Sequence, residues 1–283
     1  RALPDALCTA AYSKESNSQF VVDFPSAIML YELDRAGIQI QQNFVVSTKL
    51  ISILENEIDR LMTQPQSKMV LRISQAGTSP HVYDDGFIPR RVQALENILQ
   101  WVKEKCRTII VPKKLEFRSF FEQKTKRLSE YQHYLFHTLV LATIENNILL
   151  SEDSFVRKMI SPPGLTNINQ LLKRMLNPED LKKARRVLAQ NKVVGITIDE
   201  DILYDIYFDS KYRGIFWLAL INVRPDITCD VGYSLETILK FLKRVYVEAI
   251  ISDAERARIT TEVFKYFLQS LIVYQPTLPG IRL

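Results

Sequence analysis

Three side chains near the middle of the chain have the spacing of ligands to a metal ion. Glu130, His133 and His137 are three and four residues apart, so on a helix they share one face. A catalytic zinc ion takes three such protein ligands and keeps one position open. The segment around His137 is apolar, and the chain contains neither an HExxH motif nor a second Glu-x-x-His motif. We therefore expect histidines in the core or at an interface, with a metal site as the alternative.

An acidic series lies further along the chain. Asp201, Asp205 and Asp209 are spaced by four residues and follow one face of a predicted helix. Carboxylates in such a row can hold Mg²⁺, which prefers oxygen ligands. No second aspartate-rich segment supplies the opposite wall of such a site. The other interpretation is a solvent-facing helix surface whose acids lie favourably near the helix N-terminus.

Basic residues are concentrated between residues 173 and 192. A helix is predicted from Asn177 and Pro178, which supply a cap and a proline at the first helical position. The basic residues are Lys173, Arg174, Lys182, Lys183, Arg185, Arg186 and Lys192. Such a face can bind nucleic-acid phosphates, anionic lipid or an acidic protein surface. No aromatic residues alternate with the basic ones, so stacking on single strands is unsupported, and a solvated basic face is the alternative.

Two arginines suggest a further anion site. Arg90 and Arg91 follow Pro89 in the first turn of a predicted helix, where positive charge opposes the helix dipole. Asp84 and Asp85, in the preceding loop, are placed to compensate this charge. Alternatively, an anion binds at the helix N-terminus beside the two arginines.

The glycine content excludes the common nucleotide-binding loops. The 283 residues include 8 glycines, and the closest two, Gly77 and Gly86, are nine positions apart. GxGxxG and GxxxxGK[ST] motifs need glycines close together, because the backbone must approach phosphate. A GxSxG motif is also absent. We therefore predict no cofactor and no recognisable catalytic motif.

Cysteine usage and hydropathy indicate an intracellular protein. No CxxC pair occurs among the three cysteines, which are Cys8, Cys106 and Cys229. Sparse, unpaired cysteines are typical of a reducing compartment. The longest apolar segment, residues 134–144, is shorter than the roughly 18 residues that span a bilayer. We expect a cytoplasmic location, although a chain that begins with Arg1 is compatible with removal of an N-terminal signal.

Helical periodicity dominates the chain. Asp23 and Pro25 start a helix that stops at Gly37, and further helices begin at Ser47 and Pro89. Short strands are predicted for residues 20–23, 69–73 and 108–111, with a loop over 74–88. From residue 114 onward we predict helix almost throughout, including 130–150, with one further strand at 193–198.

These elements predict the fold class. We class the chain as essentially all-α: predominantly helical, with a few short strands mostly in the N-terminal third. Amphipathic helices from Ser234 and Asp253 predict a C-terminal antiparallel helical hairpin. A mixed region, 1–111, precedes a helical region, 112–283, with a possible break at Ser-Pro-Pro-Gly 161–164. One continuous domain is the alternative.

The functional interpretation rests on the separated acidic and basic helix faces. Complementary charged faces favour a non-enzymatic adaptor, scaffold or subunit of a larger assembly, whose partner is another protein. The formal net charge of +5 permits an anionic partner without requiring one. The first alternative is an enzyme that uses the 130–137 cluster or the 201–209 carboxylates. The second is a nucleic-acid or anionic-membrane binder that uses the 173–192 basic face.

Overall fold

The computed structural model describes most of the chain. The described residues are 18–63, 69–74, 77–82, 86–111, 129–144, 146–152, 165–225 and 230–274. Cys8, Cys229, Asp84, Asp85 and the predicted break at 161–164 lie outside them. No described helix is both long and apolar enough to cross a membrane.

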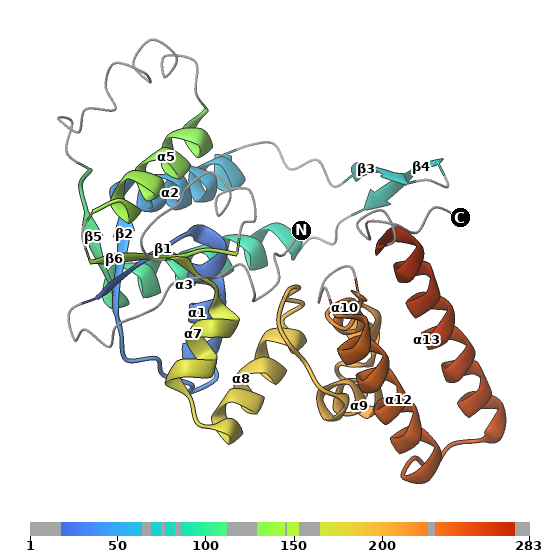
Figure 1. Ribbon diagram of the computed structural model, residues 1–283. Coiled ribbons are helices and arrows are strands. Elements are labelled where there is room, and N and C mark those ends of the chain that lie inside the picture. Colours follow the sequence, from blue (N-terminus) through green and yellow to red (C-terminus); the bar gives the residue numbers. More distant parts are fainter. Residues whose placement is uncertain are drawn as a thin grey trace.

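A parallel sheet organises the first half of the described chain (Figure 1). Its order is β5-β2-β1-β6-β7, and every neighbouring pair is parallel. The strands are β1 Gln19–Val22, β2 Asn43–Ser47, β5 Cys106–Ile109, β6 Asn147–Leu150 and β7 Leu165–Thr166. Strands β1, β2 and β6 are nearly continuous apolar runs, as expected when helices cover both faces of a parallel sheet.

Helices cover the two faces of this sheet. On one face, α1 (Phe24–Arg35) and α3 (Phe87–Lys105) pack against a cluster that includes Phe20, Val22 and Leu150. On the other face, α5 (Glu130–Ala142) packs against Val21 and Leu149. Alternate residues of each strand therefore enter different cores, which fixes the register of the sheet.

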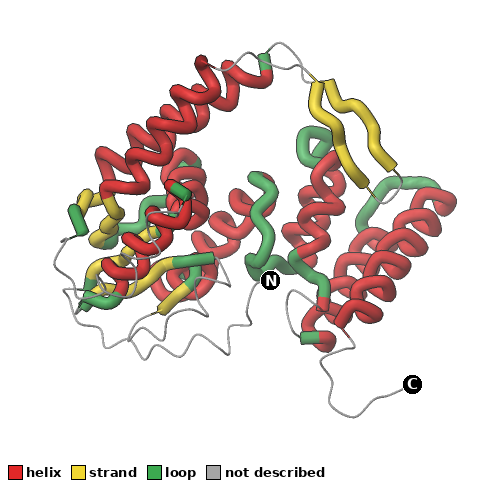
Figure 2. The backbone as a smooth tube through the Cα atoms, turned by 90° about the horizontal axis from the view of Figure 1, so that it is seen from above, coloured by secondary structure: helices red, strands yellow, loops and turns green. Residues whose placement is uncertain are grey.

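One further helix and a separate hairpin lie between β2 and α3 in the chain. Helix α2 (Thr48–Thr63) packs against both α3 and α5. Strands β3 (Met69–Ser74) and β4 (Gly77–Val82) form an antiparallel hairpin. Figure 2 shows this hairpin standing apart from the five-stranded sheet.

The rest of the described chain is helical. After β7 come α7 Ile168–Met175, α8 Pro178–Gln190, α9 Glu200–Phe208, the 3₁₀ turn η2 Arg213–Ile215, α10 Phe216–Ile221, α12 Val231–Val247 and α13 Asp253–Tyr274. Helix α8 packs against α1, and α9 packs against α12. The large core cluster runs through these helices without interruption, so the helical region and the sheet share one core.

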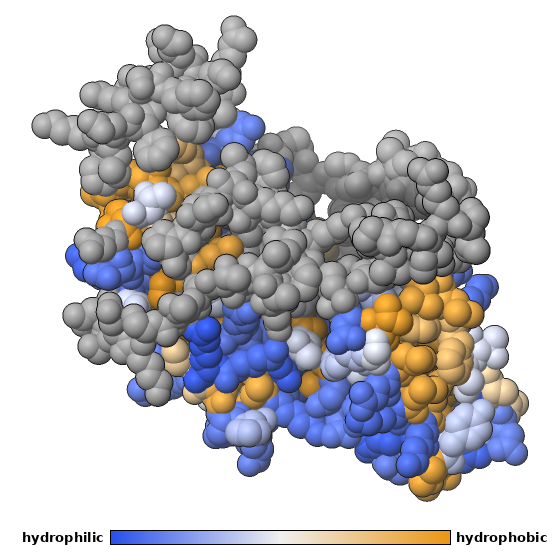
Figure 3. All heavy atoms as spheres, viewed as in Figure 1, coloured by the Kyte–Doolittle hydropathy of each residue, from blue (hydrophilic) through white to orange (hydrophobic). Residues whose placement is uncertain are grey.

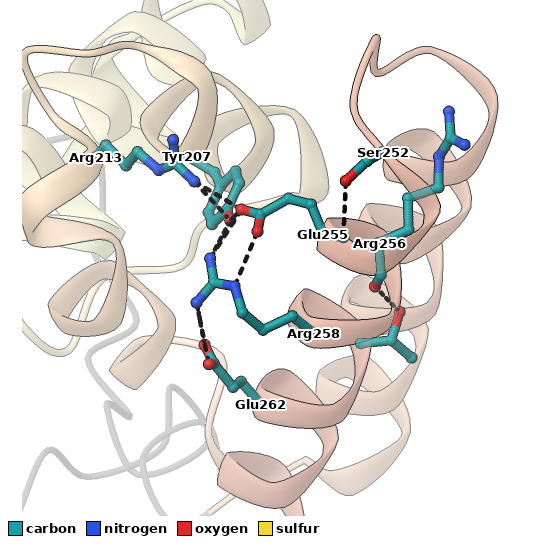
Figure 4. A network of polar contacts seen from close by, with 8 residues as sticks. Tyr207, Arg213, Ser252, Glu255, Arg256, Arg258 and Glu262 are labelled. Carbon is teal, nitrogen blue, oxygen red and sulfur yellow. Dashed lines mark hydrogen bonds and ion pairs between the residues drawn. The ribbon is translucent and has the colours of Figure 1, made fainter.

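A polar network fastens α13 to the helices before it (Figure 4). The Tyr207 hydroxyl donates to Glu255 Oε1 at 2.9 Å, and Arg213 Nη2 lies 2.8 Å from the same oxygen. Arg258 also donates to Glu255 and reaches Glu262 at 3.0 Å. The Arg213 guanidinium lies over the Tyr207 ring, 4.9 Å from its centroid. Hydrogen bonding to Arg258 and Tyr207 lowers the pKa of Glu255 to about 2.

The structure confirms the mostly helical fold class and the C-terminal hairpin of α12 and α13. The predicted helices from Asp23, Ser47 and Pro89 correspond to α1, α2 and α3. The all-α description is wrong, because five parallel strands form a sheet that spans residues 19–166. The proposed division of the chain at residue 111 stays a prediction.

Two of the segment predictions fail for identifiable reasons. Residues 130–150 are not one helix: Asn146 adopts a φ of 65°, and Asn147 Nδ2 bonds to the Leu141 carbonyl at 2.7 Å, which ends α5 and begins β6. Residues 193–198 form no strand, because their backbone groups hydrogen-bond to the Asn222 side chain and not to a neighbouring strand. Asn222 Oδ1 accepts from Gly195 N at 2.7 Å. Strands β2 and β7 were not predicted, and β4 occupies part of the segment predicted as a loop over residues 74–88.

Candidate active site

The carboxyl end of β1 is a topological switch point. From β1 the chain crosses through α1 to β2 on one side, while β6 pairs with β1 on its other side. In open α/β sheets the connections then leave in opposite directions, which opens a crevice outside the strand ends. Ligands of doubly wound folds bind in that crevice, so the residues that follow β1 and β6 are the first candidates for a site.

A row of buried polar residues follows the strand ends. Val22 pairs with Leu150, and Leu150 pairs with Thr166, so the next residues Asp23, Ser151 and Asn167 continue in register. Each of the three is at most 4% exposed, as is Ser47 at the end of β2. Burial of a polar group costs stability unless the group is hydrogen-bonded. Four buried polar residues at one sheet edge therefore mark that edge as a candidate site.

Asp23 is held by bonds to both carboxylate oxygens. It is the N-cap of α1, where Oδ1 accepts from the Ser26 amide at 2.8 Å. Its Oδ2 accepts from the Ser151 hydroxyl. The Asp23 amide donates to the Leu150 carbonyl at 3.3 Å. The carboxylate is therefore fixed between β1, β6 and the start of α1.

Tyr134 supports the start of α1 next to Asp23. This α5 side chain is 1% exposed, and its hydroxyl accepts a hydrogen bond from the Phe24 amide, next to Asp23. Burial, together with the negative charge of Asp23, raises the pKa of Tyr134 well above its usual value. The phenol is therefore neutral at physiological pH and serves as a fixed dipole behind the first turn of α1.

Glu152 brings a second carboxylate to the same edge. It follows Ser151 directly, and its Oε1 accepts from the Ile168 amide at 2.6 Å. Asn167 caps α7, since its Oδ1 accepts from the Gln170 amide at 2.8 Å. The N-termini of α1 and α7 thus both meet this edge, where their partial positive charge favours carboxylates and phosphates.

The donor set is one that hard cations prefer. Ser47 Oγ is buried and has no hydrogen-bond partner. Two carboxylates and neighbouring hydroxyls suit Mg²⁺, which takes one or two protein carboxylates and completes its shell with water and substrate phosphate. Three or more His, Cys, Asp or Glu side chains do not gather in a metal-holding group anywhere in the described part of the chain. The edge therefore fits a cation shared with a substrate better than a fully enclosed metal site.

A comparison with protein families matches the segment that carries this edge. Residues 21–161 match a family model. It is described as "PIN domain associated with the TPR-GreAB-C-PIN system". The matched range covers just under half of the 283 residues and contains both Asp23 and Glu152. Searches of curated proteins and of solved structures found no match.

This match overturns the functional interpretation drawn from charge patterns. PIN domains are a family of nucleases with acidic active sites. The interpretation as a non-enzymatic adaptor or scaffold is therefore wrong. The alternative of an enzyme with a carboxylate site has the better support, although the acids at the sheet edge differ from those singled out in the sequence.

Residues of the predicted acidic and basic faces pair with each other between helices. Lys182 and Arg186 of α8 form ion pairs with Asp201 and Asp205 of α9. Because both helices repeat their charges every four residues, the two pairs form a ladder between them. Arg244 of α12 adds a contact to Asp201 Oδ1 at 2.6 Å. These charges join helices, whereas the adaptor hypothesis needed them for an external partner.

Other members of the two faces also have partners. Lys183 pairs with Glu179 at 3.3 Å, within α8. Arg185 Nη2 lies 3.3 Å from Asn169 Oδ1. Asp209 accepts from the Lys211 amide at 2.8 Å. Lys173 and Arg174 end α7 and are likewise engaged in interactions. Binding of an anionic partner by this face stays a prediction.

The Glu130, His133 and His137 cluster does not converge on one point. The two carboxylate oxygens of Glu130 accept hydrogen bonds from Asn56 Nδ2 of α2, at 3.1 and 3.0 Å. Nδ1 of His137 is buried without a partner, and its ring stands edge-on to Phe136. Burial, followed by the charges of Lys49 and His133, lowers the pKa of His137. A partly buried, neutral histidine agrees with the expectation of a core position.

Arg91, the second of the two arginines at the start of α3, has an acidic partner on a neighbouring helix, and the expected partners Asp84 and Asp85 lie outside the described residues. Arg91 Nη2 lies 3.4 Å from Glu57 Oε1 on α2. Glu57 also binds Arg60, whose hydrogen bond lowers the Glu57 pKa. Gly86, the N-cap of α3, provides no side-chain bond. An anion beside Arg90 and Arg91 stays a prediction.

The sequence pattern identified Asp23 only as the start of a helix and did not single out Ser151 or Glu152. The informative pattern is an apolar run that ends in a polar or acidic residue, Phe-Val-Val-Asp at 20–23 and Ile-Leu-Leu-Ser-Glu at 148–152. In a parallel sheet such residues collect at one edge. The signal is visible only once residues 147–150 are recognised as a strand, which the helical prediction for 130–150 prevented.

Proposed function

We propose that this chain is a nuclease whose active site is the carboxyl edge of the sheet at Asp23 and Glu152. The observation that carries the proposal is the buried Asp23 carboxylate, bonded by Ser151 at the switch point between β1 and β6. It lies inside the segment that matches a family of nucleases with acidic active sites. The substrate class is nucleic acid and the reaction is hydrolysis of a phosphodiester bond.

Each described residue at the edge has a definite task. The N-termini of α1 and α7 attract the substrate phosphate, and the bonds from Ser26 and Ser151 keep Asp23 in one orientation. Asp23 and Glu152 would hold a divalent cation, which, when bound, polarises a phosphoryl oxygen and lowers the pKa of a water molecule. Ser47 offers a further buried hydroxyl to the same edge.

Conservative substitution of Asp23 gives the sharpest test. Asn caps helices as well as Asp does, so Asp23→Asn preserves the start of α1 while it removes the charge. We expect cleavage of labelled single-stranded RNA or DNA with Mg²⁺ or Mn²⁺, and a loss of about 100-fold or more in Asp23→Asn and Glu152→Gln. Glu104→Gln, exposed on α3, is the matched control and should cleave like the unmodified chain.

Several outcomes decide the proposal. Equal cleavage by the unmodified chain and by Asp23→Asn, with both proteins folded by circular dichroism, would contradict it. The same holds if no RNA, single-stranded DNA or double-stranded DNA is cleaved under any of the metal conditions. Preference among the three substrates identifies the natural nucleic acid.

The family description also supports a partner. The matched PIN domain is associated with a TPR-GreAB-C-PIN system. We propose that this chain acts with a TPR protein of such a system, TPR repeats being helix–turn–helix units of about 34 residues. A nucleic-acid substrate and the free thiol of buried Cys106 support the predicted intracellular location.

A further inference from the structure

Tyr131, in the first turn of α5, is an exposed aromatic residue beside the candidate active site. Its side chain is 46% exposed. Figure 3 shows a wider apolar band over α12 and α13, so exposure by itself does not single out this residue. Its place in the fold does, because the first turns of α5 lie at the sheet edge that carries Asp23.

The direction of α5 carries Tyr131 beyond the strand ends. Near the end of α5, the Leu141 carbonyl accepts from the side chain of Asn147, the first residue of β6. Near its start, the Tyr134 hydroxyl accepts from the Phe24 amide, which follows the end of β1. The helix therefore runs from the carboxyl edge of the sheet towards the amino edge. Tyr131 is about one turn before Tyr134, so it lies further out than the carboxyl ends of the strands.

Bonds at the start of α5 fix the position of this ring. Ser129 and Gln132 form a capping box, in which the Ser129 amide donates to Gln132 Oε1 at 2.8 Å. The Glu130 carboxylate is bonded to α2 at 3.0 and 3.1 Å. The ring centroids of Tyr131 and Tyr134 are 5.8 Å apart. A side chain that is already ordered loses little entropy when a ligand packs on it.

We infer that Tyr131 is a platform on which a nucleobase of a single-stranded substrate stacks beside the bond to be cleaved. This role rests on the proposed nuclease site at Asp23, whose substrate Tyr131 would select. Every base has a flat aromatic face, so stacking on a tyrosine ring tolerates any sequence. In a duplex the bases already stack on one another, so the platform favours an unpaired strand.

Lys49 supplies positive charge near the same edge. It is exposed in the first turn of α2, two residues after Ser47, which continues the β1–β2 register beside Asp23. Its ammonium group is close enough to α5 to contribute to the lowered pKa of His137. Proteins that bind single strands combine cationic side chains, which attract the phosphates, with aromatic residues, which stack on the bases. Lys49 and Tyr131 provide both at this edge.

The test separates base stacking from other contacts with the strand. Tyr131→Ala removes the ring, whereas Tyr131→Phe keeps it without the hydroxyl. Tyr246→Ala is the matched control, because Tyr246 is 52% exposed but lies on α12. Fluorescence anisotropy measures the dissociation constant of each full-length chain for labelled single-stranded RNA and DNA, with EDTA present to prevent cleavage. The same strands with abasic positions in place of nucleobases are the second probe. Circular dichroism checks that each variant is folded.

We expect Tyr131→Ala to bind the base-bearing strands about tenfold more weakly, while Tyr131→Phe and Tyr246→Ala bind like the unmodified chain. Abasic strands should bind equally to every chain, because they have no base to stack. Equal binding of the base-bearing strands by Tyr131→Ala and the unmodified chain would overturn the inference. An equal loss on the abasic strands would also overturn it, as would failure of the unmodified chain to bind any strand.

Cleavage assays on the same preparations distinguish the platform from the proposed nuclease activity. Tyr131→Ala should raise KM and leave kcat nearly unchanged, because the ring does not touch the reacting atoms. Cleavage with the same KM by both chains would overturn the platform and leave the nuclease proposal intact. Base-dependent binding without cleavage by the unmodified chain would support the platform and contradict the nuclease proposal.

Discussion

The Ser151 hydroxyl donates a hydrogen bond to Oδ2 of Asp23, joining two residues that are 128 positions apart in the chain. It links the end of β6 to the end of β1 through the buried carboxylate. The two strand ends and the start of α1 are therefore coupled through one buried side chain.

Removal of the Ser151 hydroxyl should weaken both folding and activity. Ser151→Ala leaves a buried carboxylate oxygen without its donor, and bonds to charged groups contribute about 1.5–3 kcal/mol. We expect the free energy of unfolding, from urea denaturation, to fall by that amount, with kcat reduced more than KM is raised. Ser52→Ala removes a hydroxyl that bonds only to its own helix and is the control. Unchanged unfolding in Ser151→Ala would show that the bond does not hold Asp23.

Tyr134→Phe should destabilise the start of α1. The substitution deletes the oxygen that accepts from the Phe24 amide, and a buried unsatisfied donor costs about 1–3 kcal/mol. Chemical denaturation measures the loss. Tyr131→Phe, an exposed neighbour on the same helix, should leave stability unchanged. Equal effects of the two substitutions would count against a specific role for Tyr134.

The ladder between α8 and α9 predicts a rescue by charge exchange. All four side chains are more than a third exposed, so solvent screening limits each pair to about 1 kcal/mol at most. Lys182→Asp with Arg186→Asp places like charges together and should lower the melting temperature by several degrees. Adding Asp201→Lys and Asp205→Arg should recover most of the lost melting temperature at low salt. A quadruple variant as unstable as the double one would exclude the ladder as a stabilising contact.

Acid should loosen the attachment of α13. The folded pKa of Glu255 is about 2, below its ordinary value of 4.5, so its bonds to Arg258 and Tyr207 stabilise the fold fully above that ordinary value. The contribution is lost as pH falls from about 4.5 through about 2. Glu255→Gln should therefore reduce the melting temperature at pH 7 and remove part of the acid sensitivity between these two values. Parallel pH profiles for both proteins would contradict this.

Local signals in the sequence predicted many elements correctly. Asp23 and Pro25 define the start of α1, and the apolar period of 3.6 residues identifies α2, α12 and α13. These features depend on residues within a few positions of one another, so the sequence alone is sufficient. Short buried strands lack such a signal: the apolar run at 147–150 is equally compatible with a helix, and only its pairing with β1 makes it a strand.

The site depended on non-local contacts. By itself the sequence determined which residues cap helices and which helix faces carry charge, because caps and periodicity act over one or two turns. The tertiary structure decided that Asp23 meets Ser151 at a strand edge, and that Lys182 faces Asp201. Both contacts follow from strand order and helix packing, which are set by burial of apolar surface across the whole chain. The neighbours of these charged side chains, and with them their roles, could therefore be assigned only from the tertiary structure.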